Sequence, residues 1–222
     1  MPDYISVREF HEAEGTEDWR VVGDGACAYF RTGTFAEGAR LVQAIGELPG
    51  VEDHSPDVDL RPDGVTVRLL TRSNDWYGMS KRDVELARQI SSAARELGLA
   101  ADPSAVQSVL VIPGAPDTAE VMPFWRAVLA YGPRADTPDE DLVDPRSRGP
   151  SFWFEPMKEP RADGGGAIHI AIWVPYEQAE ARIKAALAAG GRMVRDEFAP
   201  MWWTLADPAG NEADISTAKS RD

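Results

Sequence analysis

Few side chains in this sequence can carry acid–base or metal chemistry. The chain holds three histidines, His11, His54 and His169, and one cysteine, Cys27. The histidines are far apart along the chain, which argues against a site built from all three. A single cysteine can form neither an internal disulfide nor a thiolate zinc site.

The segment around His54 is rich in polar side chains. Asp53 precedes the histidine, Ser55 follows it, and Asp57 comes three residues later. An imidazole titrates near neutral pH and can therefore act as both a base and an acid. Proton transfer is therefore one role open to His54, and a hydrogen bond that stabilises the local turn is another.

The composition excludes several classes of partner. The 222 residues include 23 Lys and Arg against 37 Asp and Glu, a net charge of −14, whereas nucleic-acid binding depends on clustered Lys and Arg. No apolar run approaches the roughly 20 residues that span a bilayer, and the first residues lack the basic and apolar regions of a signal peptide. We expect a cytoplasmic protein that binds neither nucleic acid nor membrane.

Residues 1–98 are predicted to form an α+β domain with the element order ββαββα. Two pairs of strands flank the tight-turn signals at residues 23–25 and 62–64. Residues 65–71 alternate with a period of two, which is typical of a strand with one buried face. A linker is predicted at residues 99–104, with the second domain covering residues 105–222.

Both helices of the first domain have recognisable beginnings. Thr34 and Glu37 have the spacing of a capping box, and the buried face of this helix is predicted to begin with Phe35. The second helix is predicted to begin near Ser80, where Asp83 interacts favourably with the helix dipole.

From residue 105 onward the chain contains an internal repeat. Gln107 lies six residues before Pro113, and His169 lies six residues before Pro175. In both copies an Ala-rich helix, an Asp-Pro pair and a last strand follow. Two copies of the order βαβββ predict a pseudo-symmetric domain with a cleft between the copies.

The first half resembles the pterin-4a-carbinolamine dehydratase family. The likeness is carried by Trp19, Thr71 and residues 30–35, 53–58, 65–67 and 78–83. Family members expel water from a 4a-hydroxytetrahydropterin, which needs a base for the ring N–H and an acid for the leaving hydroxide. The resemblance therefore implies a dehydratase-type lyase in which His54, with Asp53 or Asp57, transfers protons.

The catalytic pattern of this family is incomplete here. The family has two adjacent histidines, but His54 is followed by Ser55. Arg72 and Gly50 stand where the family has a third histidine and a glutamate, and Trp76 lies in a longer connection. Ser55 is no base near pH 7, and Arg72 stays charged and can only bind or polarise. The resemblance implies that Arg72, Ser55 and Trp76 bind substrate, with Arg72 holding an anionic group, or that the pocket is a binding remnant.

The second half resembles the vicinal oxygen chelate superfamily, nearest to its glyoxalase-like branch. The likeness is carried by residues 124–129, 169–175 and 203–212. The resemblance implies metal-ligand positions at Gln107, His169 and Asp214, with Glu212 on the same side of its strand. These groups could hold a divalent ion, but Trp153 occupies the fourth position and argues against one.

Two roles are open for Trp153, Trp202 and Trp203. They could pack in the core, or they could line a cleft that holds flat apolar ligands, as in metal-free members of this fold.

Three functions remain open at this stage. The leading hypothesis is a lyase that acts on a small heterocyclic or carbonyl substrate, with His54 transferring protons and no firm cofactor. The alternatives are a non-catalytic small-molecule-binding protein and a metal-dependent lyase or dioxygenase that uses His169 and Asp214. The habits of the dehydratase family also imply a homo-oligomer.

Overall fold

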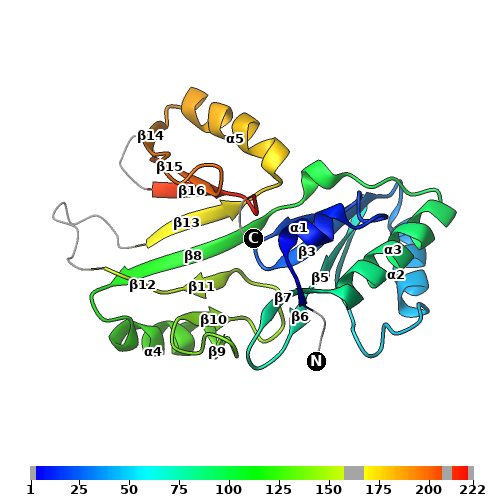
Figure 1. The fold of residues 1–222 in the computed structure, drawn as a ribbon, viewed down its shortest axis with the longest axis horizontal. Coiled ribbons are helices and arrows are strands. Elements are labelled where there is room, and N and C mark those ends of the chain that lie inside the picture. Colours follow the sequence, from blue (N-terminus) through cyan, green and yellow to red (C-terminus); the bar gives the residue numbers. More distant parts are fainter. Residues whose placement is uncertain (1–3, 158–167, 207–211, 220–222) are drawn as a thin grey trace. The chain divides into compact units, whose positions relative to one another are not determined.

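We describe a computed structural model that covers residues 4–157, 168–206 and 212–219, without the side chains of residues 124, 127 and 128. The chain forms two compact units. The first contains the residues up to Gln107 except Ser73–Asp75, and the second contains Ser73–Asp75 and the residues from Ser108 to Ser220. The predicted α+β class with two domains is confirmed (Figure 1). Residues 207–211 of the glyoxalase-like motif lie outside the described ranges. Within those ranges no helix has the length and apolar character to cross a membrane.

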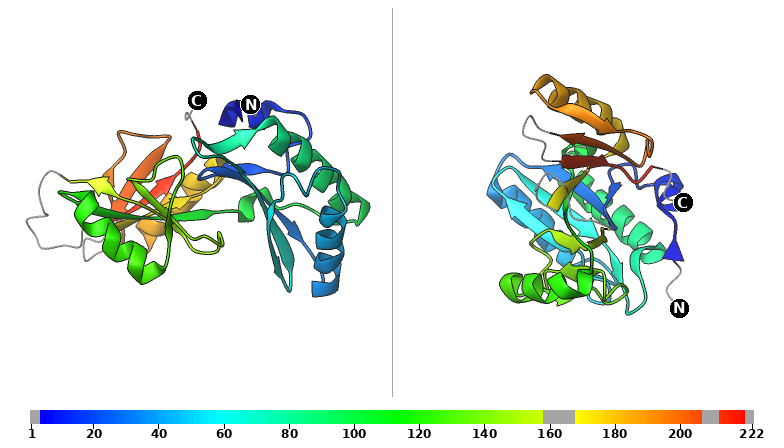
Figure 2. Two further views of the ribbon diagram at one scale, coloured as in Figure 1. Left: turned by 90° about the horizontal axis from the view of Figure 1, so that it is seen from below. Right: turned by 90° about the vertical axis from the view of Figure 1, so that its left-hand side faces the viewer.

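The first unit is built on a four-stranded antiparallel sheet with two helices. The sheet order is β2-β3-β5-β4. The elements are β2 (Arg20–Val22), β3 (Gly25–Arg31), α2 (Phe35–Gly46), β4 (Asp57–Arg61), β5 (Gly64–Leu69) and α3 (Lys81–Glu96). Both helices lie next to each other on one side of the sheet (Figure 2). The predicted order ββαββα is present.

Shorter elements extend this order. They are β1 (Tyr4–Ile5), α1 (Val7–Glu12), β6 (Thr71–Arg72), β7 (Tyr77–Ser80) and a 3-10 turn, η1 (Pro103–Ala105). The strand predicted over residues 65–71 is too long, because β5 ends at Leu69 and Thr71 pairs with Gly78 in a separate sheet of order β1-β7-β6. This separate hairpin carries Thr71 and Ser80 toward the start of α3.

The capping box of α2 is confirmed, but its predicted buried face is partly wrong. The Glu37 amide donates to Thr34 Oγ1 at 3.2 Å, and the Thr34 amide donates to Glu37 Oε2 at 3.1 Å. Phe35 is 57% exposed. The face that meets the sheet is centred on Gly38, where an added Cβ would lie 2.4 Å from a Leu60 methyl, so the helix packs through its smallest residue.

The second unit contains one mixed sheet with two copies of the predicted βαβββ order. The sheet order is β14-β15-β16-β13-β8-β11-β10-β9, with β12 also paired to β8. The first copy is β8 (Ser108–Ala115), α4 (Thr118–Leu129), β9 (Gly132–Pro133), β10 (Asp141–Val143), β11 (Ser151–Trp153) and β12 (Glu155–Pro156). The second copy is β13 (Ile168–Trp173), α5 (Tyr176–Ala188), β14 (Arg192–Arg195), β15 (Trp202–Ala206) and β16 (Glu212–Ser216). The first strands of the two copies, β8 and β13, pair antiparallel (Figure 1).

One face of this sheet is covered by α4 and α5. Near α5, the buried cluster contains Val174, Ala179, Leu205 and Ile215. Near α4, it contains Leu142, Phe152 and Phe154. Side chains alternate along a strand, so their neighbours point to the opposite face, which we call the helix-free face.

The two prolines that suggested equal spacing in the repeat do not occupy equivalent places. Pro113 lies inside β8, whereas Pro175 is the N-cap residue of α5, after β13 has ended. Gln107 consequently lies one residue before β8 and belongs to the first unit, whereas His169 lies within β13. The matching of Gln107 with His169 is therefore wrong. Equal spacing from a proline does not give the two residues equivalent positions in their strands.

Candidate functional site

The imidazole of His54 is paired with a carboxylate that the sequence analysis did not pair with it. His54 Nε2 lies 2.7 Å from Asp83 Oδ1. Asp83 is the third residue of α3, and its side chain is completely buried, whereas the His54 side chain is 16% exposed. The pair joins the loop before β4 to the first turn of α3.

Asp83 is held in place by its second oxygen. Oδ2 accepts hydrogen bonds from the Thr71 hydroxyl at 2.7 Å, from the Ser80 amide at 2.7 Å and from the Ser80 hydroxyl at 2.9 Å. The Ser80 amide bond is half of the capping box that begins α3. The carboxylate is therefore fixed by the same hydrogen bonds that start the helix.

This environment keeps Asp83 ionised. Burial raises the pKa of its carboxyl, but the hydrogen bonds from His54, Thr71 and Ser80 favour the charged form and lower the pKa overall. An ionised, immobile carboxylate fixes the ring orientation and tautomer of its histidine and stabilises the imidazolium.

A pocket of about 530 Å³ lies beside His54. One wall comes from the loop after α2, and the other comes from α3. The residues that line it are Pro49, Gly50, Asp53, His54, Arg82, Glu85, Leu86 and Gln89. The volume falls within the range of sites for small organic molecules, so the pair has access to a ligand-sized space.

Neither predicted partner makes the close contact with His54 that Asp83 makes. Asp53 lines the pocket, but Asp57 Oδ2 accepts a hydrogen bond from Arg72 at 2.7 Å and lies 3.9 Å from the Arg68 Nε. Asp57 sits in β4 opposite Arg68, because strand register, and not closeness in sequence, sets its neighbours. The prediction that Asp53 or Asp57 supports His54 is therefore corrected to Asp83.

The three residues expected to bind substrate in this unit do not line the His54 pocket. The Ser55 hydroxyl donates to the Val51 carbonyl at 2.8 Å and so holds the loop. Arg72 forms its ion pair with Asp57. Trp76 packs against Tyr4, with ring centroids 4.8 Å apart.

The second unit also contains a histidine–aspartate pair. His169 Nε2 lies 3.4 Å from Asp214 Oδ2, with side chains 25% and 12% exposed. Thr204 donates to the other oxygen of Asp214 at 2.6 Å. The interaction with Asp214 raises the pKa of His169, burial opposes this rise, and the charges of Glu155 and Glu212 add to it.

The residues described do not fit a complete metal site. Among them, no group of three or more His, Cys, Asp or Glu side chains is arranged to hold an ion. His169 and Asp214 could supply two ligands, and Glu212 lies on the same face of β16 as Asp214. Gln107 belongs to the other unit.

The three tryptophans for which a cleft role was predicted separate onto two faces. Register places Trp153, Trp202, His169 and Asp214 on the helix-free face. Trp202 stacks on Phe198 there, with ring centroids 4.3 Å apart. Trp203 is partly buried and packs against the buried cluster beneath α5, on the face opposite to Trp202.

Sequence reasoning missed Asp83 as the partner of His54, and it missed Arg82, Glu85 and Gln89 as lining residues. One signal was available for Asp83. The Ser80-x-x-Asp83 spacing is that of a capping box, with aspartate at the third helical position. The contact of Asp83 with His54, 29 residues away, cannot be predicted from the local sequence around either residue.

Two family models match separate parts of the chain. The model for pterin 4 alpha carbinolamine dehydratase matches residues 5–93. The model for a glyoxalase-like domain matches residues 109–216. The first match contains both His54 and Asp83, and the second contains His169 and Asp214.

Individual relatives agree for the first unit. Two of them are named "Putative pterin-4-alpha-carbinolamine dehydratase". The one from Nocardia farcinica (strain IFM 10152) is 36% identical over 35% of this chain and 80% of its own length. The one from Mycobacterium leprae (strain Br4923) is 34% identical over 33% of this chain and 76% of its own length.

A solved structure of a glyoxalase/bleomycin resistance protein/dioxygenase superfamily member from Vibrio splendidus 12B01 aligns with 50% of this chain and 99% of its own. The TM-score is 0.32 at 15% identity, too low to support an argument. The sequence relatives and the two family models carry the assignment. The chain belongs to the pterin-4a-carbinolamine dehydratase family through its first unit, to which a glyoxalase-like domain is fused.

Proposed function

We propose that the first unit is a dehydratase-type lyase that acts on a small heterocyclic substrate, with His54 as the proton-transfer group. The observation that carries this proposal is the contact of 2.7 Å between His54 Nε2 and the buried Asp83 carboxylate, beside a ligand-sized pocket. Curated relatives with names of dehydratases support the same reaction class.

The pair suits the elimination of water. With Nε2–H donating to Asp83, the lone pair on Nδ1 is left to accept a proton. The base takes the proton of a ring N–H, the nitrogen electrons form a C=N bond, and the neighbouring C–O bond breaks. The imidazolium then gives its proton to the departing hydroxide, which leaves as water.

One imidazole must then do work that is shared among several groups in the family pattern. Ser55 is occupied by the Val51 carbonyl, and Arg72 by Asp57. We therefore expect a slower reaction, or a substrate with a better leaving group, than in relatives with the full set. Arg82, Glu85 and Gln89 supply charged and amide groups for orienting that substrate.

The test uses a freshly generated 4a-hydroxytetrahydropterin and the full chain. His54→Gln should lower the dehydration rate by at least about 100-fold, because general acid–base groups contribute roughly 10²–10⁴-fold. His11→Gln is a matched control outside the pocket and should leave the rate unchanged. A rate equal to that in buffer, unaffected by His54→Gln, would exclude the proposal.

A second candidate function concerns the glyoxalase-like unit. The stacked Phe198 and Trp202 rings, near the His169–Asp214 face, favour binding of a flat apolar molecule. Titration with 2-naphthol, followed by tryptophan fluorescence, should show saturable quenching that Trp202→Leu removes and Trp76→Leu keeps. Quenching that persists in Trp202→Leu would place the probe elsewhere.

A further inference from the structure

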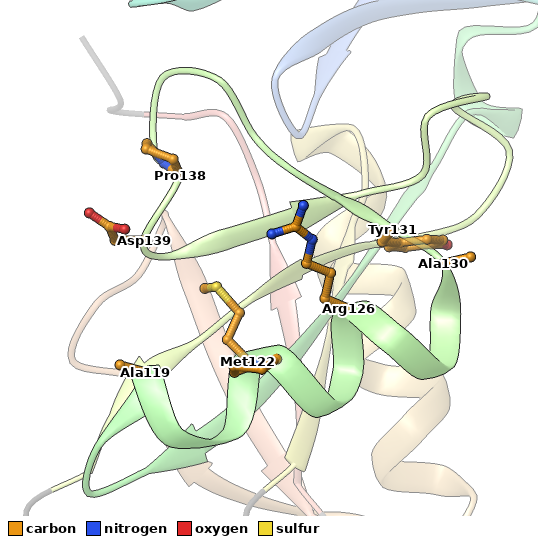
Figure 3. Close-up of a pocket in the computed structure, with 8 residues that line it drawn as sticks. Ala119, Met122, Arg126, Ala130, Tyr131, Pro138 and Asp139 are labelled. Carbon is orange, nitrogen blue, oxygen red and sulfur yellow. The ribbon is translucent and has the colours of Figure 1, made fainter.

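A second pocket, of about 710 Å³, lies in the glyoxalase-like unit between α4 and the loop that joins β9 to β10 (Figure 3). One wall is a single face of α4, formed by Ala119, Met122, Pro123 and Arg126. These residues follow the spacing of three and four that puts side chains on one side of a helix. The pocket is separate from the His169–Asp214 pair.

The opposite wall is a loop held in a defined shape. Arg134 forms a bidentate ion pair with Asp136, with N–O distances of 2.7 and 3.0 Å. The Thr137 hydroxyl donates to the buried Asp141 carboxylate at 2.5 Å. A wall fixed in this way needs little ordering when a ligand binds, which favours affinity.

Arg126 gives the pocket a positive charge. Its guanidinium extends from α4 toward the loop (Figure 3). Within the described residues Arg126 has no ion-pair partner. In a chain with a net charge of −14, an arginine that pairs with no carboxylate among the described residues can bind a ligand carboxylate through its planar guanidinium.

Two other polar groups of the lining residues are acceptors. Asp139 lies at the rim formed by the loop (Figure 3). Pro123 lies inside α4 and has no N–H, so the Ala119 carbonyl lacks its usual helical donor. Both groups repel anions. A ligand carboxylate must therefore lie at the Arg126 end, and a second negative charge is disfavoured.

The remaining surface of the pocket is apolar. It comes from Met122, Pro123, Pro138 and the ring of Tyr131. Tyr131 packs edge-on against Phe152, with centroids 6.0 Å apart, and its hydroxyl points at Gly149. The ring is thereby fixed, and it presents hydrocarbon to the pocket.

We propose that this pocket binds a small monocarboxylate with an apolar body, whose carboxylate pairs with Arg126. The site does not depend on the function proposed for the first unit, because every lining residue belongs to the second. Carboxylates of aromatic or branched aliphatic acids fit the chemistry. Phosphate esters, which carry two charges, do not.

Calorimetric titration of the full chain with 3-phenylpropionate tests the proposal. Arg126→Gln should weaken binding about tenfold or more, because hydrogen bonds to charged groups are among the strong ones, and Arg126→Lys should give a smaller loss. Arg146→Gln removes an exposed arginine outside the pocket and should leave binding unchanged. Circular dichroism on each variant checks that the fold is intact.

Two further probes complete the experiment. Phenethylamine has the same shape with the opposite charge, and phenyl phosphate carries a second negative charge. Both should bind at least about tenfold more weakly than 3-phenylpropionate, by the same charge argument. The proposal is overturned if 3-phenylpropionate does not bind, if Arg126→Gln binds it as well as the native chain, or if either further probe binds equally well.

Discussion

The two units each place a histidine beside an aspartate, but they position the pair in different ways. In the first unit, Asp83 is completely buried and receives four hydrogen-bonding contacts, and His54 lies on a loop at a pocket. In the second unit, His169 and Asp214 lie on neighbouring strands, 3.4 Å apart, with side chains 25% and 12% exposed. A helix start holds a carboxylate more firmly than a strand does, because its free N–H groups need acceptors.

The shifted pKa belongs to a different member of each pair. In the first pair, the hydrogen bonds lower the pKa of the aspartate. In the second pair, the interaction with aspartate raises the pKa of the histidine. The contribution of Asp83 to stability is therefore lost in acid, whereas that of His169 is lost in alkali.

The largest expected difference between the pairs is in stability. Asp83→Ala should lower the free energy of unfolding by about 3–5 kcal/mol, because it leaves buried donors without an acceptor. Asp214→Ala should cost only about 1–2 kcal/mol. Urea denaturation of both variants measures this. Equal losses would contradict the view that Asp83 is the more firmly held carboxylate.

The contribution of Asp83 to stability should be lost in acid. Its folded pKa lies below its unfolded pKa, so the ionised carboxylate stabilises the fold above the ordinary value of about 3.9. That contribution disappears as the pH falls through the lowered folded pKa. The difference in stability between the native chain and Asp83→Asn, followed from pH 6 to pH 2, should shrink on acidification. A difference that grows toward low pH would reverse the assigned sign.

The contribution of His169 to stability should be lost in alkali. Its folded pKa is raised, so the protonated ring stabilises the fold fully below the ordinary value of about 6.5. The contribution disappears as the pH rises through the raised folded pKa. The native chain and His169→Gln should therefore converge in urea midpoint between pH 5.5 and pH 9. If their separation stays constant over this range, the Asp214 interaction does not depend on the ring charge.

The smallest expected effect concerns the loop that carries His54. Gly50 has a φ of +80° and accepts the His54 amide hydrogen bond, so Gly50→Ala should cost about 1 kcal/mol through the left-handed backbone. Gly46→Ala, at the end of α2 with open space around it, is the matched control and should be neutral or stabilising. Chemical denaturation compares the two. Equal effects would mean that the loop does not require glycine at position 50.

Local patterns in the sequence were enough to predict the α+β class, the order ββαββα, the repeated βαβββ unit and the capping box of α2. Capping spacings, turn residues and strand alternation are properties of residues that are close in the chain, so they can be read before folding. Alternation also implies that Trp202 and Trp203 point to opposite faces, although it does not say which face the helix covers.

Tertiary structure alone decided the chemistry. The pairing of His54 with Asp83, the ion pair of Asp57 with Arg72, the packing of Trp203 beneath α5 and the pocket beside Arg126 all depend on strand register and helix packing. These bring together side chains from distant parts of the sequence. The partner of a side chain depends on which element packs against its own element. The types of the neighbouring residues in the sequence do not determine that packing.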